Sequence, residues 1–177
     1  MVQLTPIGGF VAAQVYRRDT PTLSWFVSVD FSPELAGEEA VLISDGIPWP
    51  FRDWRELDGA TLDCDNLGAM QSALFLGGVE HDPVLATHTS IRLSRSEGRR
   101  FVVHVELDFH ESEPEVGSRL SLVRELPFDG VLIQPLNVVP FPSDVEAARS
   151  LAESLIEPAA FLPPEFDGTS YVCAPRI

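Results

Sequence analysis

The segment from residue 100 to residue 110 alternates between apolar and polar side chains, and no other feature restricts the fold as strongly. The apolar positions are Phe101, Val103, Val105, Leu107 and Phe109. A period of two places these side chains on one face of a β-strand and the polar ones on the other. The segment is therefore expected to be a strand that packs one face against a core and exposes the other to water.

Residues 84–95 are expected to pair with this strand as a β-hairpin. The connecting loop is predicted to be Ser96-Glu97-Gly98, with Gly98 in the left-handed conformation that such turns require. This register pairs Leu93 with Phe101, Ile91 with Val103, Ser90 with His104 and His88 with Glu106. Because paired residues share a face of the sheet, one polar face is predicted to carry His88, His104, Glu106, Asp108 and His110.

Other segments complete a β-rich pattern. Further strands are expected at 10–17, 22–31, 39–44, 59–64, 118–126 and 130–134. One helix is expected after Asp65 or Asn66, where Leu67, Met70 and Leu74 recur at helical spacing. A second helix is expected to begin at a capping box formed by Ser143 and Glu146.

These elements predict an α+β fold, because short turns join the strands and helices do not alternate with them. The sheet is expected to be mostly antiparallel, with about 6–8 strands and two helices packed on it. A β-barrel or sandwich with peripheral helices is the alternative. A length of 177 residues fits one globular domain over 1–177, with an irregular, proline-rich C-terminal tail at 159–177.

The charge of the chain restricts its partners. The formal net charge is -15, from 27 acidic and 12 basic residues, and every basic residue is arginine. The absence of lysine excludes lysine Schiff-base chemistry and a Walker-type phosphate lysine, and it is typical of GC-rich bacterial genomes. Because phosphates would be repelled, nucleic acid is not expected as a partner. A basic protein partner is favoured, and the alternative is that the acidity maintains solubility.

Neither a membrane segment nor a compartment signal is expected. No apolar run approaches the length of a membrane helix, and no basic region precedes the apolar N-terminal stretch as in a signal peptide. The two cysteines, Cys64 and Cys173, lie far apart and suggest no disulfide framework. The sequence therefore indicates a cytoplasmic protein with reduced thiols, and no cofactor is predicted.

Three groups of residues are candidates for function. Imidazole and carboxylate side chains at His88, His104 and Glu106 have the chemistry to bind a divalent metal or to do acid–base work. The proline-restrained loop IPWPFRDW carries Trp49, Phe51 and Trp54, which are typical of protein interfaces, although the loop can instead fold back and plug an end of the sheet. An acidic rim for a basic partner is expected from Glu106, Asp108, Glu111, Glu113 and Glu115.

The segment Asp63-Cys64-Asp65 is not expected to hold a reactive thiol. Two neighbouring carboxylates raise the pKa of a thiol and so disfavour the thiolate. The sequence also lacks a Gly-x-Ser-x-Gly elbow that would anchor a hydrolase triad.

The favoured function is accordingly a non-enzymatic acidic protein-binding domain, such as an immunity or antitoxin-like protein that docks onto a basic protein. One alternative is a metal-binding protein or metal-dependent enzyme that uses His88, His104 and Glu106. Another is a structural subunit of a larger assembly, with the aromatic loop as its interface.

Overall fold

The structure is a computed structural model that describes residues 4–32, 40–65, 71–76, 83–110 and 117–177. Within these ranges the strands are β1 (Pro6–Tyr16), β2 (Thr22–Phe31), β3 (Ala40–Ile47), β4 (Thr61–Asp65), β5 (Gln71–Leu76), β6 (Val84–Arg95), β7 (Arg100–Phe109), β8 (Arg119–Ile133), β9 (Glu165–Phe166) and β10 (Tyr171–Cys173). The helical elements are η1 (Trp54–Leu57), α1 (Val145–Glu153) and η2 (Pro158–Ala160), of which only α1 is an α-helix.

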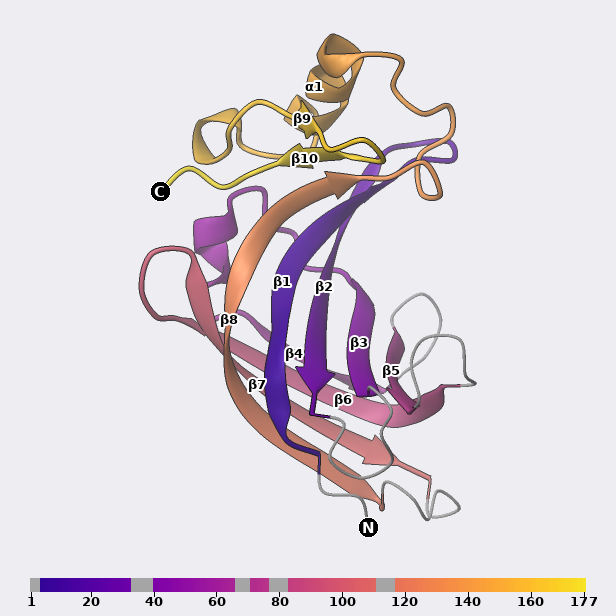
Figure 1. Ribbon diagram of the computed structural model, residues 1–177, viewed down its shortest axis with the longest axis vertical. Coiled ribbons are helices and arrows are strands. Elements are labelled where there is room, and N and C mark those ends of the chain that lie inside the picture. Colours follow the sequence, from indigo (N-terminus) through magenta and orange to yellow (C-terminus); the bar gives the residue numbers. More distant parts are fainter. Residues whose placement is uncertain (1–3, 33–39, 66–70, 77–82, 111–116) are drawn as a thin grey trace.

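Seven strands close into a barrel in the order β1-β2-β3-β5-β6-β7-β8 (Figure 1). The long strand β8 closes it. Residues Arg119–Pro127 pair antiparallel with β7, and residues Phe128–Leu132 pair parallel with β1. The other neighbouring pairs of the barrel are antiparallel. Strand β6 pairs with β5 only at Val84 and Leu85, and its residues 88–92 pair with β4. The end of β8 pairs with β10, which extends the sheet.

A glycine lies where β8 leaves β7 and meets β10. Gly130 has a φ of +115°, and a Cβ atom there would lie 2.4 Å from the carbonyl oxygen of Cys173. Only glycine combines this conformation with so close an approach between two backbones.

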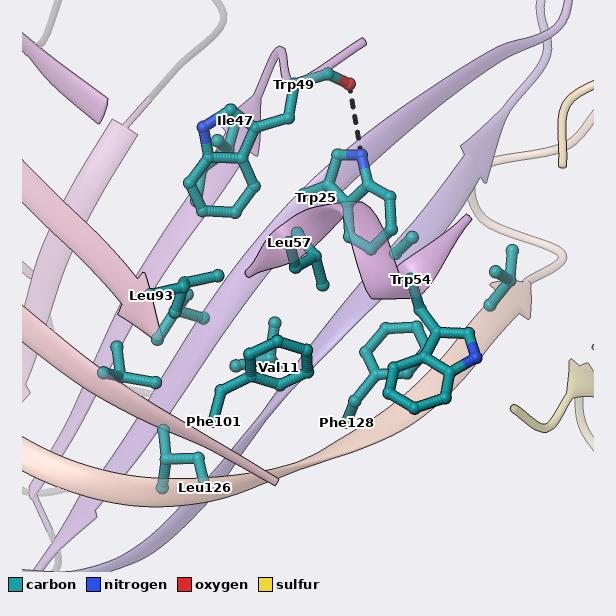
Figure 2. Close-up of a cluster of buried hydrophobic side chains, with 14 of the residues drawn as sticks. Val11, Trp25, Ile47, Trp49, Trp54, Leu57, Leu93, Phe101, Leu126 and Phe128 are labelled. Carbon is teal, nitrogen blue, oxygen red and sulfur yellow. Dashed lines mark hydrogen bonds between the residues drawn. The ribbon is translucent and has the colours of Figure 1, made fainter. Parts of the chain in front are cut away.

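Apolar side chains fill the barrel, and the aromatic loop closes one end of it. From η1, Trp54 and Leu57 enter the core and are fully buried. Figure 2 shows Trp54 beside Phe128, with ring centroids 6.0 Å apart and planes inclined by 14°. The indole nitrogen of Trp54 donates to the carbonyl of Ala160 at 3.1 Å, so its polar atom is satisfied. The expectation that this loop plugs an end of the sheet is confirmed.

The prediction of an α+β sheet with two helices is wrong, because the structure is a mostly β closed barrel. The region expected to hold the first helix contains β5, whose Ser72 and Leu74 face the barrel interior. Residues 66–70 lie outside the described ranges. Strand β5 forms its backbone hydrogen bonds with β3 and β6. These tertiary contacts outweigh the local preference for a helix that the spacing of Leu67, Met70 and Leu74 indicated. The barrel alternative describes the architecture, with α1 as the one α-helix of the described part.

The second predicted helix is present as α1, but its cap differs. Asp144, and not Ser143, is the N-cap, and its Oδ1 accepts from the backbone nitrogen of Ala147 at 2.8 Å. The hydroxyl of Ser143 donates to the other carboxylate oxygen of Asp144 at 3.1 Å. A carboxylate that receives both bonds and lies at the positive end of the helix is the better cap.

The C-terminal segment, expected to be irregular, is tied to the barrel by short elements. β10 pairs with the end of β8, and Phe161 forms a bridge with Pro175. The Nε of Arg176 donates to the carbonyl of Phe161 at 2.8 Å. As a result, α1, β9 and β10 lie together at one end of the barrel, at the top of Figure 1.

Candidate functional site

The hairpin of β6 and β7 is present, but its register differs by two residues from the predicted one. Leu93 pairs with Val103, and Ile91 pairs with Val105. The three-residue loop lies one position later than expected, because the backbone nitrogen of Ser96 donates to the carbonyl of Arg100 at 2.9 Å and leaves Glu97-Gly98-Arg99 between them. Since the shift is an even number of residues, every side chain keeps its predicted face. Gly98 has the expected positive φ, at 58°.

Cross-strand pairing places four charged residues in one row on the outer face of the barrel. The row runs from Asp65 on β4 through His88 on β6 and Asp108 on β7 to Arg119 on β8. His88 Nδ1 lies 3.0 Å from Asp65 Oδ1, and Arg119 Nε lies 3.8 Å from Asp108 Oδ1. When His88 is protonated the charges alternate in sign along the row, so each neighbouring pair attracts.

The next row adds two more carboxylates, Asp63 on β4 and Glu106 on β7, with serines between and beside them. His88 Nε2 lies 3.3 Å from Asp63 Oδ1, and Arg119 Nη2 donates to Glu106 Oε2 at 2.6 Å. The side chains of Asp63 and Asp65 are 72% and 73% exposed. We call Asp63, Asp65, Glu106 and Asp108 the acidic face.

Carboxylates surround the imidazole of His88. The hydrogen bond to Asp65 raises the pKa of His88, burial opposes this effect, and the charges of Asp63, Asp65 and Asp108 raise it further. Both ring nitrogens face a carboxylate, so the protonated form, in which both nitrogens donate, suits the site. The raised pKa favours the protonated imidazole over the neutral form that a metal ligand requires.

The structure does not bring the predicted ligands His88, His104 and Glu106 together. His104 lies opposite Arg92, and along β7 it is four residues from the partner of His88, which corresponds to roughly 13 Å. Glu106 is held by Arg119. Among the described residues, no group of three or more His, Cys, Asp or Glu side chains is placed to hold a metal ion.

The other predicted site residues are placed as follows. His110 follows the end of β7 and is exposed. Glu111, Glu113 and Glu115 lie outside the described residues.

Two of the three loop aromatics are largely buried. Trp54 is fully buried and Trp49 is 7% exposed, while Phe51 is half-buried against Trp49. The prediction that all three form a protein interface is therefore corrected for Trp49 and Trp54, because their indole rings are packed in the core.

Sequence reasoning missed Asp63 and Asp65 of the acidic face, and it missed Arg119 as the ion-pair partner of Glu106 and Asp108. Strands were expected at 59–64 and 118–126, but no local pattern indicated that β4 extends to Asp65 and pairs with β6. The expected effect on the intervening thiol is confirmed in direction. Burial raises the pKa of Cys64 most, and the charges of Asp63 and Asp65 raise it further.

No protein-family model, curated protein or solved structure matches this chain. Among the described residues, no helix has the length and apolar character needed to cross a membrane. Inferences about function therefore depend on the geometry and charge of the chain itself.

Proposed function

We propose that this chain is a non-enzymatic binding protein whose acidic face docks onto a basic protein partner. The observation that carries the proposal is an excess of carboxylates on one exposed surface. Four carboxylates on β4 and β7, the two strands that flank β6 here, face the imidazole of His88 and the guanidinium of Arg119. The residual negative charge is available to lysine and arginine side chains of a partner.

The surrounding structure supports this role. The carboxylates project from β4 and from the barrel strand β7, which both pair with β6, so binding does not require a loop to become ordered. A net charge of -15 extends an attractive field toward a basic protein and raises the rate of encounter. Because rim charges contribute mainly to association and specificity, this surface is expected to select the partner.

The concrete form of the proposal is an immunity or antitoxin-like protein of the cytoplasm, which covers a basic surface on another protein. Its support is the size, the acidity and the preformed acidic face of the chain, and it is an analogy at the level of protein class. The two thiols, which form no disulfide, fit a reducing compartment.

The test is capture of a partner from the native lysate, followed by mass spectrometry. A D63N/D65N/E106Q/D108N variant removes the acidic face, and an E97Q/E146Q/E153Q/E165Q variant removes the same formal charge elsewhere. We expect the wild type and the control to capture one basic protein that is released at high salt, and the acidic-face variant to lose it.

Two results would contradict the proposal. Equal loss of the partner by both variants would show that net charge and not the acidic face is responsible. A purified wild type that stays monomeric and captures no basic protein would exclude the binding role.

A further inference from the structure

We propose that a second site, a cleft on β1–β3, binds an organic cation: a guanidinium or primary ammonium group on an aliphatic stem. The cleft has a volume of about 730 Å³, which is in the usual range for small-ligand sites. Its lining includes Tyr16, Leu23, Asp45, Pro48, Trp49 and Pro50. It is separate from the acidic face and does not depend on the function proposed above.

At the polar side of the cleft, the carboxylate of Asp45 accepts from neutral donors. The hydroxyl of Tyr16 lies 3.1 Å from Asp45 Oδ2 and 3.0 Å from Gln14 Oε1. It has one hydrogen, so it donates to only one of these oxygens at a time. Asp45 Oδ1 also accepts from the backbone nitrogen of Gly46 at 2.6 Å, and Gln14 Oε1 accepts from the amide of Asn137 at 2.7 Å.

Burial and the neighbouring Asp45 raise the pKa of Tyr16 to about 12. The phenol therefore keeps its proton at neutral pH and adds no second negative charge beside the carboxylate. A ligand that brings several N–H donors complements this arrangement, because an ionised carboxylate has about four lone-pair sites and the two neutral donors of Asp45 leave some of them available.

Asp45 also lacks a cationic partner within the part of the chain that the structure describes. None of the described arginine or histidine side chains forms an ion pair with it. Arg18 lines a neighbouring hollow that shares Tyr16 with the cleft, and it is exposed. A half-buried carboxylate without a counter-charge attracts a cation more strongly than an exposed one, because water screens it less.

The apolar side of the cleft is preformed. The indole nitrogen of Trp49 donates to the carbonyl of Thr61 at 2.9 Å, and the carbonyl of Trp49 accepts from Trp25 at 3.1 Å (Figure 2). Pro48 and Pro50 flank this anchored residue and restrict the backbone. The wall therefore provides a fixed apolar surface for an aliphatic stem, while Asp45 recognises its charged end.

The experiment is a titration of the full-length protein followed by NMR of the tryptophan indole N–H groups. Agmatine represents a small free amine, and an acetylated arginine methylamide represents a protein side chain. N-Butylurea is the neutral analogue. We expect saturable shifts of Trp49 and little change of Trp54, which lies in the plug of the barrel. Whichever cation binds more tightly identifies the source of the ligand.

The variants follow from the contacts. Asp45→Asn is expected to weaken cation binding roughly tenfold or more, because it removes a charge-assisted contact. Glu97→Gln removes one charge from the distant hairpin loop and is expected to bind like the wild type. Tyr16→Phe deletes only the hydroxyl and is expected to weaken binding severalfold.

The proposal is overturned if neither cation gives a saturable shift, if N-butylurea binds as well as agmatine, or if Asp45→Asn binds like the wild type. If Asp45→Asn does not fold, the comparison of agmatine with N-butylurea on the wild type decides the question. The acidic-face variant is expected to retain cation binding, so failure of one proposal does not imply failure of the other.

Discussion

The hydroxyl oxygens of Ser44 and Ser72 lie 2.7 Å apart inside the barrel, where β3 pairs with β5. Both residues are fully buried, and the surrounding interior is apolar. A buried hydroxyl requires a hydrogen-bond partner, and here each strand supplies one. The pair therefore favours the observed register of the two strands, because a shift would separate the hydroxyls.

A double-mutant cycle tests this pair. Ser44→Ala and Ser72→Ala are each expected to lower the free energy of unfolding by about 1–3 kcal/mol, since each change removes one partner of a buried hydrogen bond. The double variant is expected to cost less than the sum, with a coupling of about 0.5–1.5 kcal/mol. Urea unfolding measures all four proteins. Strict additivity would show that the two hydroxyls do not depend on each other.

Trp54 is expected to be a major source of stability. Trp54→Ala should lower the free energy of unfolding by about 3–5 kcal/mol, because it leaves a cavity beside Phe128 and Phe101. Leu136→Ala is the control, since this side chain is 93% exposed, and its effect should stay within about 0.5 kcal/mol. Equal effects of the two substitutions in chemical denaturation would contradict the position of Trp54 in the core.

His88 is expected to make stability depend on pH. Its pKa is raised in the folded protein, so its contribution is complete below the unfolded value of about 6.5 and is lost as the pH rises through the folded value. The difference in Tm between the wild type and His88→Gln should therefore be largest near the acidic end of a scan from about pH 5.5 to 9 and should shrink toward alkaline pH. A difference that grows with pH would mean that the neutral imidazole is the stabilised form.

The two cysteines are expected to react very differently with a thiol reagent. Burial raises the pKa of Cys173 to about 12, so this thiol should react only after unfolding. Cys64 is partly exposed and should react slowly in the native protein. An Asp63→Asn/Asp65→Asn variant should label faster at Cys64, because the nearby negative charge that opposes thiolate formation is gone. An unchanged labelling rate would show that burial alone controls this thiol.

Substitutions of Ser143 and Asp144 at the N-cap of α1 are expected to differ in their effect on stability. Asp144→Ala is expected to cost about 0.5–2 kcal/mol, because it removes the acceptor for the backbone nitrogen of Ala147. Ser143→Ala should cost less, since its hydroxyl only supports that carboxylate. Thermal unfolding of the two variants provides the comparison, and a larger loss for Ser143→Ala would restore the predicted capping box.

Local patterns in the sequence predicted some of the strands well. β2 and β6 begin and end where alternation predicts, at Thr22–Phe31 and Val84–Arg95. The same alternation correctly predicted that His88, Glu106 and Asp108 share the outer face. These features depend on neighbours along the chain or across one short turn, so sequence contains the necessary information.

Local patterns in the sequence did not predict contacts between distant segments. The position of β4 beside β6 brings Asp65 to His88, and no local pattern specifies that pairing. The cleft residues Tyr16 and Asp45 likewise meet only because β2 lies between β1 and β3. The fold class was missed for the same reason, since closure of a sheet is a relationship between its two outermost strands.

That closure has a consequence for synthesis of the protein in the cell. β1 is the first strand of the barrel to leave the ribosome, but its parallel neighbour, Phe128–Leu132, emerges only after the other barrel strands. Until then one edge of β1 has no strand of its own chain to pair with, and such edges recruit strands from other chains. Pairing over so long a separation also slows folding. The nascent chain therefore passes through an aggregation-prone stage, and a ribosome that stalls before Phe128 releases a sheet that cannot close.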